Sequence, residues 1–365
     1  MLERIIFILL NIIIYNIIYL SLGKRKNLSF NAVFVLIFIF CLFPYWSGDY
    51  FHFKDSVEMA KKMIITNIDV PEEPIYISLA NLLHGNYFIF RFILWGGGLV
   101  LICNSLKNLK LLNKNSLCIF ACVSLLMYSY ARAYIALSFL MWGVSYFYSS
   151  SKKQIIKWLL LLITCAISIY FHRSAIIPVL FVIINVFLKP TNRNLLIFAI
   201  VFSLLLLSLR QYINAWIDSY TALYESDLDI GMNRAYEYIA AEKEIVWSPS
   251  YILNFILTYA PLLYGFVFFV KNHVSEQRVS HKPIDEFVNI YIYIAMASFA
   301  ILLIGIGSWA IFYRVANMVF IPLAFILAFN YNNGTYIKQT KVILTMLFVW
   351  SNYSLIYSLY NYITG

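Results

Sequence analysis

The chain has 365 residues, of which 62% are hydrophobic, 18% aromatic and only 12% charged. Soluble domains carry about 25% charged residues, so this composition excludes a water-soluble protein of this size. The formal net charge is +10, and its distribution along the chain decides whether it reflects a nucleic-acid partner or membrane topology.

Apolar runs of about 15–20 residues follow one another along the whole chain, and a helix of about 20 residues crosses a bilayer. The alternating patterns of barrel strands are absent. We therefore expect an all-α fold, a single polytopic membrane domain over residues 1–365. The first run lacks a small-residue cleavage site and is interpreted as a span, not a signal peptide. The twelve expected spans are 5–22, 30–45, 87–106, 116–130, 133–149, 157–171, 174–188, 195–210, 251–270, 287–304, 312–330 and 342–360.

Twelve crossings divide the connecting segments between two sides. One side holds sixteen of the 27 Lys and Arg residues with three of the 17 acidic residues, and the other holds eleven basic and fourteen acidic residues. The positive-inside rule makes the first side cytoplasmic, so both termini are expected to face outward. The basicity is therefore a topology signal, and no nucleic-acid partner is expected. The outer side carries a segment at 46–86, whose apolar piece 74–84 is expected to enter the membrane without crossing, and a long loop at 211–250.

All five cysteines lie inside apolar runs, so we interpret them as small buried hydrophobes; they are Cys41, Cys103, Cys118, Cys122 and Cys165. The sequence contains no CxxC and no HExxH. No metal site is therefore predicted.

Aromatic and acidic side chains mix in the outer segment 46–86. Trp46, Tyr50 and His52 surround Asp49, and Glu73 follows in "EEPIYISLANLL". Aromatic rings stack on sugar rings, and carboxylates accept hydrogens from sugar hydroxyls. An interfacial aromatic belt would explain the aromatic residues alone. Carboxylates near an apolar boundary are costly without partners, so Asp49 and Glu73 favour a glycan site.

Two places join apolar spans through basic residues instead of a polar loop. Arg132 lies in "YSYARAYIALSF", and His172 and Arg173 lie in "SIYFHRSAIIPVL". Arg132 could snorkel to the interface, or its planar fork could bind phosphate oxygens. His172 could be an ordinary interfacial histidine, or it could act as a base or a donor. All three residues are expected on the outer face.

The long loop 211–250 is rich in Tyr, Asp and Glu and carries Arg234, and "GSWAIFYRVANMVFIP" adds Arg314. Loops of this length in compact proteins are usually functional or disordered. The outer face thus combines arginines, which bind diphosphate, with aromatic and acidic residues, which bind sugars. A lipid-linked sugar diphosphate at the membrane surface presents both kinds of group and is the ligand class that fits.

Five ordered motifs on the outer side resemble those of the EpsG-like, Wzy-type polysaccharide polymerases, from about residue 30 to 325. The motifs are "FPYWSGDYFHF", "EEPIYISLANLL", "ARAYIALSF", "YFHRSAIIPVL" and "FYRVANMVFIP". Such enzymes join repeat units carried on undecaprenyl diphosphate at the outer face of the bacterial inner membrane, in O-antigen, capsule or exopolysaccharide synthesis. The resemblance implies a GT-C-like membrane glycosyltransferase without metal or cofactor, with a chain-length regulator protein as one partner to consider.

The resemblance also implies roles for individual residues. Arg132, His172 and Arg314 occupy motif positions, Asp49 and Glu73 lie in two further motifs, and Arg234 is assigned by region only. The catalytic candidates are His172, Arg132 and Asp49. The diphosphate-binding candidates are Arg132, Arg173, Arg234 and Arg314, and the glycan-binding candidates are Glu73, Tyr50, His52 and Trp46.

Three other functions fit a chain of this kind. A flippase for the same lipid-linked units would need polar residues in a central cavity and often shows an internal repeat; the spans here are nearly free of charge and show no repeat. A membrane O-acyltransferase would need cytoplasmic access to its acyl donor, and His273 and His281 are the only cytoplasmic histidines. An O-antigen ligase uses similar chemistry and remains an alternative.

Overall fold

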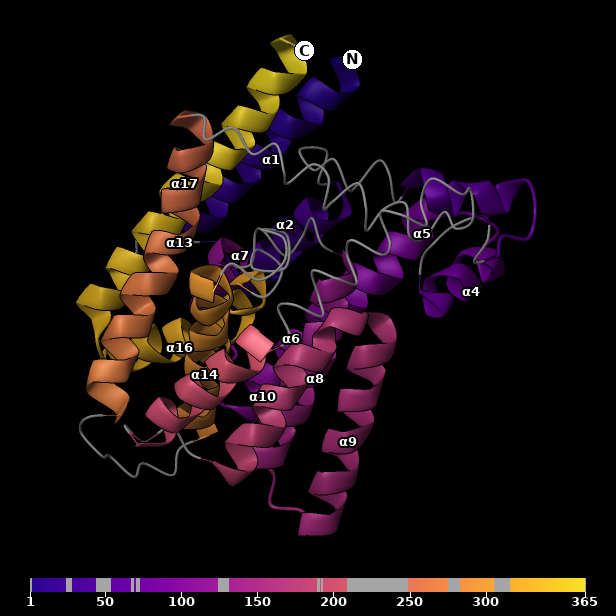
Figure 1. The fold of residues 1–365 in the computed structure, drawn as a ribbon. Coiled ribbons are helices and arrows are strands. Elements are labelled where there is room, and N and C mark those ends of the chain that lie inside the picture. Colours follow the sequence, from indigo (N-terminus) through magenta and orange to yellow (C-terminus); the bar gives the residue numbers. More distant parts are fainter. Residues whose placement is uncertain are drawn as a thin grey trace.

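The computed structural model describes residues 2–23, 28–43, 54–66, 69, 73–123, 131–188, 191, 193–208, 249–274, 283–304 and 316–364, and every regular element within these ranges is helical (Figure 1). The elements are α1 (Leu2–Leu20), α2 (Phe30–Leu42), η1 (Met59–Lys61), α4 (Pro74–Leu82), α5 (Tyr87–Arg91), η2 (Phe92–Gly96), α6 (Gly97–Asn108), α7 (Lys114–Val123), α8 (Ala131–Ser149), α9 (Gln154–Phe171), η4 (Arg173–Ala175), α10 (Ile176–Phe187), α13 (Pro249–Phe269), η5 (Val270–Val274), α14 (Pro283–Ile304), α16 (Phe320–Asn333) and α17 (Ile337–Thr364). A further helix spans Arg193–Ser208.

Every expected span falls at least in part on a described helix. Within the described part of the chain, five helices are long and apolar enough to cross a membrane by length and composition. They are Glu3–Leu20, Tyr87–Asn108, Gln154–Phe171, Pro283–Ile301 and Ile337–Tyr360. The all-α, multi-pass membrane architecture is thereby confirmed, while the number of twelve crossings stays a prediction.

Three helices form the centre of the molecule. Residues 116–123 of α7, 287–295 of α14 and 320–328 of α16 are buried on every face. A helix that is apolar all round is stable only when other helices surround it. Phe120 of α7 contacts Phe325 of α16 edge to face, with ring centroids 4.9 Å apart, and Phe325 also contacts Phe287 of α14 at 4.8 Å. These rings join the three helices into one core.

The peripheral helices keep apolar side chains on the outside. On α9, Leu159 is 60% exposed and Leu162 55% exposed. The helix Arg193–Ser208 exposes Leu204 to a similar extent. Such faces would be unstable in water, whereas hydrocarbon accommodates them, and backbone groups in hydrocarbon must bond within the helix. The exposed apolar rim is therefore the surface expected to meet lipid.

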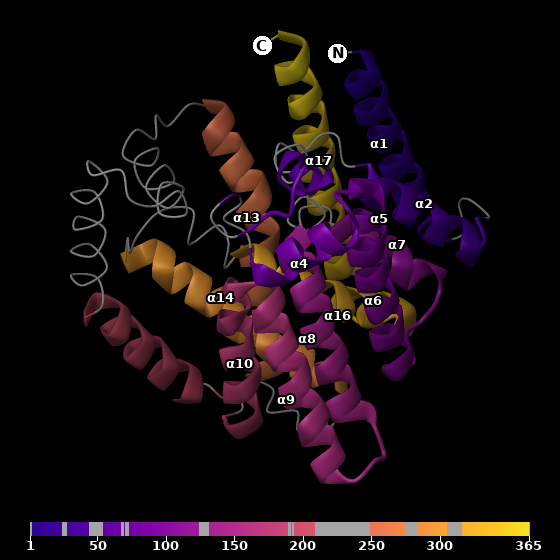
Figure 2. The ribbon, with the colours of Figure 1, turned by 90° about the vertical axis from the view of Figure 1, so that its right-hand side faces the viewer.

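Helices α8 and α9 pack closely because one residue at their interface lacks a side chain. A methyl group at Gly143 would overlap Thr164 Oγ1, and the ring of Phe139 stacks on that of Phe171 with centroids 5.4 Å apart. Small residues at a membrane-helix interface allow the backbones to approach. The pair stands upright in Figure 2, and α4 lies beside its upper end in Figures 1 and 2.

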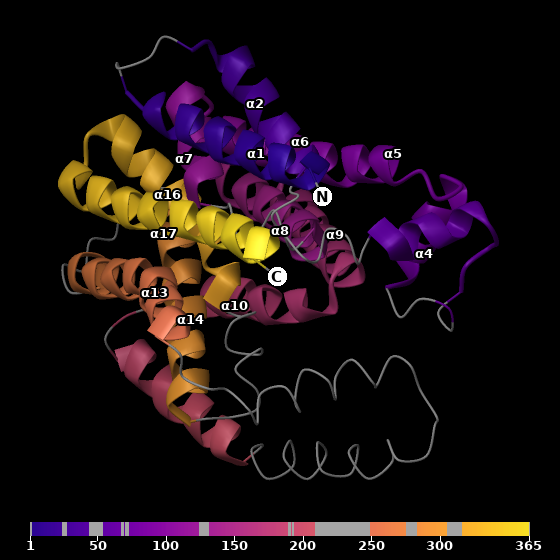
Figure 3. The same ribbon diagram turned by 90° about the horizontal axis from the view of Figure 1, so that it is seen from above.

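Both ends of the chain lie at the same end of the bundle, as Figure 3 also shows from above. The guanidinium of Arg4 lies over the ring of Tyr362, 4.2 Å from its centroid. An even number of crossings requires this arrangement.

Helix α14 begins at Pro283, four residues before the expected start at 287. The expected boundary was wrong because Asp285 and Glu286 were assigned to the preceding loop. Pro at the first helical position and acidic residues in the first turn are in fact signals of a helix start.

The cysteines of the described residues are free thiols. Cys118, Cys122 and Cys165 are buried, and Cys103 is half-buried. Their interpretation as small apolar residues is consistent with these positions. The side chain of Cys41 and residues 211–248 of the predicted loop 211–250 lie outside the described residues, and α13 begins at Pro249.

Candidate active site

Three polar side chains from distant parts of the sequence meet beside the upper ends of α8 and α9. Glu73 Oε2 lies 2.7 Å from Arg132 Nη1, and Glu73 Oε1 lies 3.2 Å from His172 Nδ1. We name Glu73, Arg132 and His172 the outer cluster. The side chains are 10%, 35% and 17% exposed, in that order. Three of the residues predicted from sequence thus form one constellation, with a carboxylate between a cation and an imidazole.

Glu73 is placed by the start of helix α4. It is the residue before Pro74, whose fixed φ suits the first helical position. A residue here commonly bonds the first helical N–H groups through its side chain, but Glu73 makes no such bond. Its carboxylate turns instead to Arg132 and His172. The positive end of the helix still favours the negative charge.

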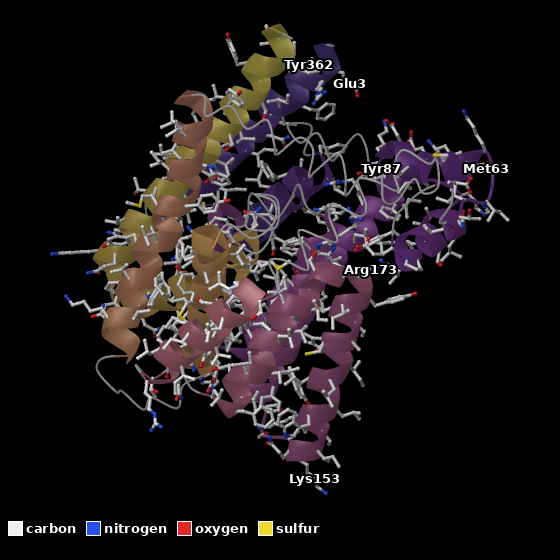
Figure 4. All side chains as sticks on the ribbon, in the orientation of Figure 1. Glu3, Met63, Tyr87, Lys153, Arg173 and Tyr362 are labelled. Carbon is white, nitrogen blue, oxygen red and sulfur yellow. The ribbon has the colours of Figure 1, made fainter. Side chains whose placement is uncertain are left out.

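His172 lies at the break between α9 and α10. Its backbone is extended, with φ −156° and ψ 112°, and its N–H donates to Ser168 O at 3.0 Å, which ends α9. Its carbonyl accepts from Ala175 N at 2.8 Å and so opens the short turn η4. The "FHRSA" sequence therefore reverses the chain direction here, and Figure 4 shows the neighbouring Arg173 at the upper end of α9, opposite Lys153.

Two hydrogen bonds hold the elements that carry the cluster. Ser168 Oγ donates to Ala136 O at 2.7 Å, and these residues lie one helical turn below His172 and Arg132, respectively. Tyr76 Oη donates to Phe171 O at 2.7 Å. The last carbonyls of a helix have no partner within it, so this bond satisfies the end of α9 and ties α4 to it. The cluster therefore rests on fixed backbone.

The electrostatics of the cluster keep Glu73 ionised. Burial by itself would raise the pKa of this carboxyl group. The hydrogen bond from His172 and the positive charge of Arg132 outweigh burial and lower the pKa from 4.5 to about 2. The carboxylate is therefore negative throughout the physiological pH range and acts only as an acceptor.

Comparison with known proteins identifies the family of this chain. A family model described as the EpsG family matches residues 27–364, nearly the whole chain. The chain belongs to the EpsG family. EpsG proteins are a family of Wzy-like polysaccharide polymerases, so the resemblance seen in the sequence motifs is confirmed. No curated protein and no solved structure matches the chain.

The remaining predicted residues of this EpsG protein fall into two groups. Arg173 follows His172 directly and its side chain is exposed; the described contacts do not join it to the outer cluster. Six predicted residues lie outside the described residues: Trp46, Asp49, Tyr50, His52, Arg234 and Arg314. Their assignments stay predictions.

A further buried cation was not predicted from the sequence. Arg91 is 2% exposed, its Nη1 donates to Tyr87 Oη at 3.1 Å, and its guanidinium lies 3.7 Å from the Trp95 ring centroid. Aromatic residues one turn before and one turn after an arginine can hold the cation by cation–π contact. The sequence did contain a signal for this site: Arg91 is the only charged residue in "NYFIFRFILWGGG", and Tyr87 and Trp95 lie four residues before and after it.

Within the ranges that the structure describes, no three His, Cys, Asp or Glu side chains gather where they could hold a metal ion. The outer cluster offers other chemistry. An imidazole held by a carboxylate can accept a proton, and a partly exposed arginine can bind an anion.

Proposed function

We propose that this EpsG protein is a Wzy-type polymerase that joins oligosaccharide repeat units carried on undecaprenyl diphosphate at the outer face of the bacterial inner membrane. One observation carries the proposal: an imidazole and a guanidinium are fixed on one carboxylate at the boundary of an apolar helix bundle. The substrate has the same division, with a lipid tail for the bilayer and a diphosphate and glycan for the surface. The GT-C-like relationship and the twelve crossings are part of the proposal.

The reaction is glycosyl transfer between two lipid-linked molecules. A hydroxyl oxygen of the incoming repeat unit attacks the anomeric carbon of the growing chain, a new C–O bond forms, and the bond from that carbon to the diphosphate oxygen breaks. Undecaprenyl diphosphate leaves with the electron pair. His172 takes the hydroxyl proton, with Asp49 as the second choice for this role.

Negative charge develops on the leaving diphosphate, and donors held in place beforehand stabilise it. Arg132 serves this role in the proposal because its side chain is 35% exposed and is anchored at one nitrogen by Glu73. Arg173, Arg234 and Arg314 are proposed as further diphosphate ligands, and Trp46, Tyr50 and His52 as glycan contacts. A chain-length regulator protein is proposed as a further partner.

Deletion of the gene in its host tests the function directly, with the surface polysaccharide resolved on a gel. The polymerase function requires that species with a single repeat unit remain while the long ladder disappears. Loss of the single-repeat species as well would contradict it and favour a flippase or ligase. Purified full-length protein in nanodiscs should then lengthen lipid-linked repeat units without any added partner.

A further inference from the structure

We propose that Glu73 is a positioning residue that fixes the tautomer of His172. This proposal rests on the function proposed above, in which His172 is the base. The two oxygens of Glu73 have different partners, Arg132 Nη1 on Oε2 at 2.7 Å and His172 Nδ1 on Oε1 at 3.2 Å. An ionised carboxylate only accepts hydrogen bonds. Nδ1 must therefore carry the hydrogen of this contact.

The fixed Nδ1–H determines what the other ring nitrogen can do. In a neutral imidazole only one nitrogen carries a hydrogen, so Nε2 has the lone pair. Among the residues that the structure describes, none forms a hydrogen bond with Nε2 of His172. The ring is 17% exposed. The nitrogen that accepts a proton is therefore Nε2, turned away from the carboxylate.

Arg132 helps to keep the proton on the imidazole and off the carboxylate of Glu73. It lies on the opposite oxygen of Glu73 and, together with the hydrogen bond from His172, holds the pKa of the carboxyl group at about 2. The carboxylate therefore orients the imidazole and stabilises the imidazolium that forms, and it does not take the proton itself. Among the described residues, the charged groups of this neighbourhood are Glu73 at the start of α4, which contacts the His172 ring, Arg132 of α8 on the other oxygen of Glu73, and Arg173, the next residue in the chain.

This role differs from the glycan contact expected for Glu73 from the sequence. Both carboxylate oxygens are already hydrogen-bonded, and the side chain is only 10% exposed. A hydroxyl of a sugar would have to compete with a guanidinium at 2.7 Å, and charge-assisted bonds of this kind are about twice as strong as neutral ones. Glu73 therefore acts through His172 and Arg132.

The substitution Glu73→Gln gives a specific expectation. A side-chain amide has only one oxygen, and Arg132 can only donate, so Arg132 takes the amide oxygen. The NH₂ group then faces His172 Nδ1 and must donate to it. This arrangement forces the hydrogen onto Nε2 and removes the base. Glu73→Asp keeps two acceptor oxygens on a side chain shorter by one methylene and should keep the native tautomer.

Nitrogen NMR of the full-length protein in nanodiscs, with ¹⁵N-labelled histidine, tests the proposal. The chain has five histidines, and the signal that disappears in His172→Gln assigns the ring. We expect a protonated Nδ1 and an unprotonated Nε2 in the wild type at neutral pH, the opposite tautomer in Glu73→Gln, and the native one in Glu73→Asp. A wild-type ring with its hydrogen on Nε2, or an unchanged tautomer in Glu73→Gln, would overturn the proposal.

Polymer synthesis provides the second readout. Because the wrong tautomer removes a general base, Glu73→Gln should lower the rate by about 10²–10⁴-fold, and Glu73→Asp should recover part of it. Glu58→Gln is the matched control, since Glu58 belongs to the exposed pair with Lys61 at 2.8 Å and should change neither readout. Full polymerisation by Glu73→Gln would contradict the positioning role.

The tautomer measured by NMR does not depend on which reaction the protein catalyses. A deletion strain that contradicts the polymerase function would therefore leave the NMR test of the Glu73 role intact, and the two failures can be told apart.

Discussion

Helix α8 carries a polar cluster at each end, and the two clusters differ in their partners. In the outer cluster, Glu73 meets a guanidinium and an imidazole. At the other end, Glu286 Oε2 accepts from Asn185 Nδ2 at 2.8 Å and from Asn289 Nδ2 at 3.3 Å, and Asn185 also reaches Tyr148 Oη at 3.4 Å. Arg132 and Tyr148 are sixteen residues apart on one helix, which corresponds to about 24 Å.

The comparison teaches that a carboxylate at the end of a bundle is no sign of catalysis by itself. Asn185 is fully buried and Asn289 is 4% exposed, and both are neutral donors that join α10 and α14. The outer cluster keeps a cation and a titratable ring partly exposed. The inner cluster, which consists of Tyr148, Asn185, Glu286 and Asn289, joins helices α8, α10 and α14. The outer cluster has the groups that proton transfer and anion binding need. The experiments below test this division, from the largest expected effect to the smallest.

Replacing His172 by Ala should have the largest effect on activity. Loss of a general base costs about 10²–10⁴-fold in rate, so long polymer should disappear while the protein level in the membrane is unchanged. His84→Asn is the control: His84 is exposed with φ 47°, and Asn tolerates this left-handed conformation. Wild-type ladders from His172→Ala, or equal loss from the control, would contradict the assignment of the base.

Replacing Arg132 by Ala should lower the rate by about 10²–10³-fold, because the leaving diphosphate loses a positioned donor. Arg132→Lys restores the charge but not the planar fork, so it should recover only part of the activity. The measurement is polymer formed by purified variants from lipid-linked repeat units. Identical rates for the Ala and Lys variants would show that the charge of this residue is not used.

Replacing Glu286 by Ala should affect stability and leave the chemistry intact. Buried amide donors on Asn185 and Asn289 would lose this acceptor, at a cost of about 1–3 kcal/mol. The melting temperature of the purified variant should fall, while the rate per folded molecule stays near that of the wild type. A Glu286→Ala variant that is fully stable but inactive would contradict the expectation that only the outer cluster takes part in the reaction.

The smallest effect concerns pH. The folded-state pKa of Glu73 is depressed to about 2, so its stabilising contribution is complete above the ordinary value of 4.5 and is lost as pH falls from there toward 2. The difference in melting temperature between the wild type and Glu73→Gln should therefore shrink as pH falls from about 4.5 toward 2. A difference that grows within this window would contradict the sign of the shift.

Much of the fold was predictable because membrane helices are coded locally. The described parts of the apolar runs are helical, since hydrocarbon leaves the backbone no other partner, and α4 was anticipated as the short helix at 74–84. The start of α14 was missed because Pro283, Asp285 and Glu286 were assigned to a loop. The π-helical turn at Phe92–Gly96 was not anticipated either, since it leaves no periodicity signal in so short a segment.

The sequence by itself determined that this is a helical membrane protein of the EpsG kind, and it predicted Glu73, Arg132 and His172 as site residues. It could not assign Glu73 to His172, because the two residues are 99 positions apart and nothing in either motif refers to the other. Only the tertiary structure shows that Glu73 and His172 are in contact. The absence of a side chain at Gly143 lets α8 pack closely against α9. The hydrogen bond from Tyr76 to Phe171 joins α4 to the upper end of this pair. The ends of three helices therefore lie together, and their polar residues Glu73, Arg132 and His172 are in contact there.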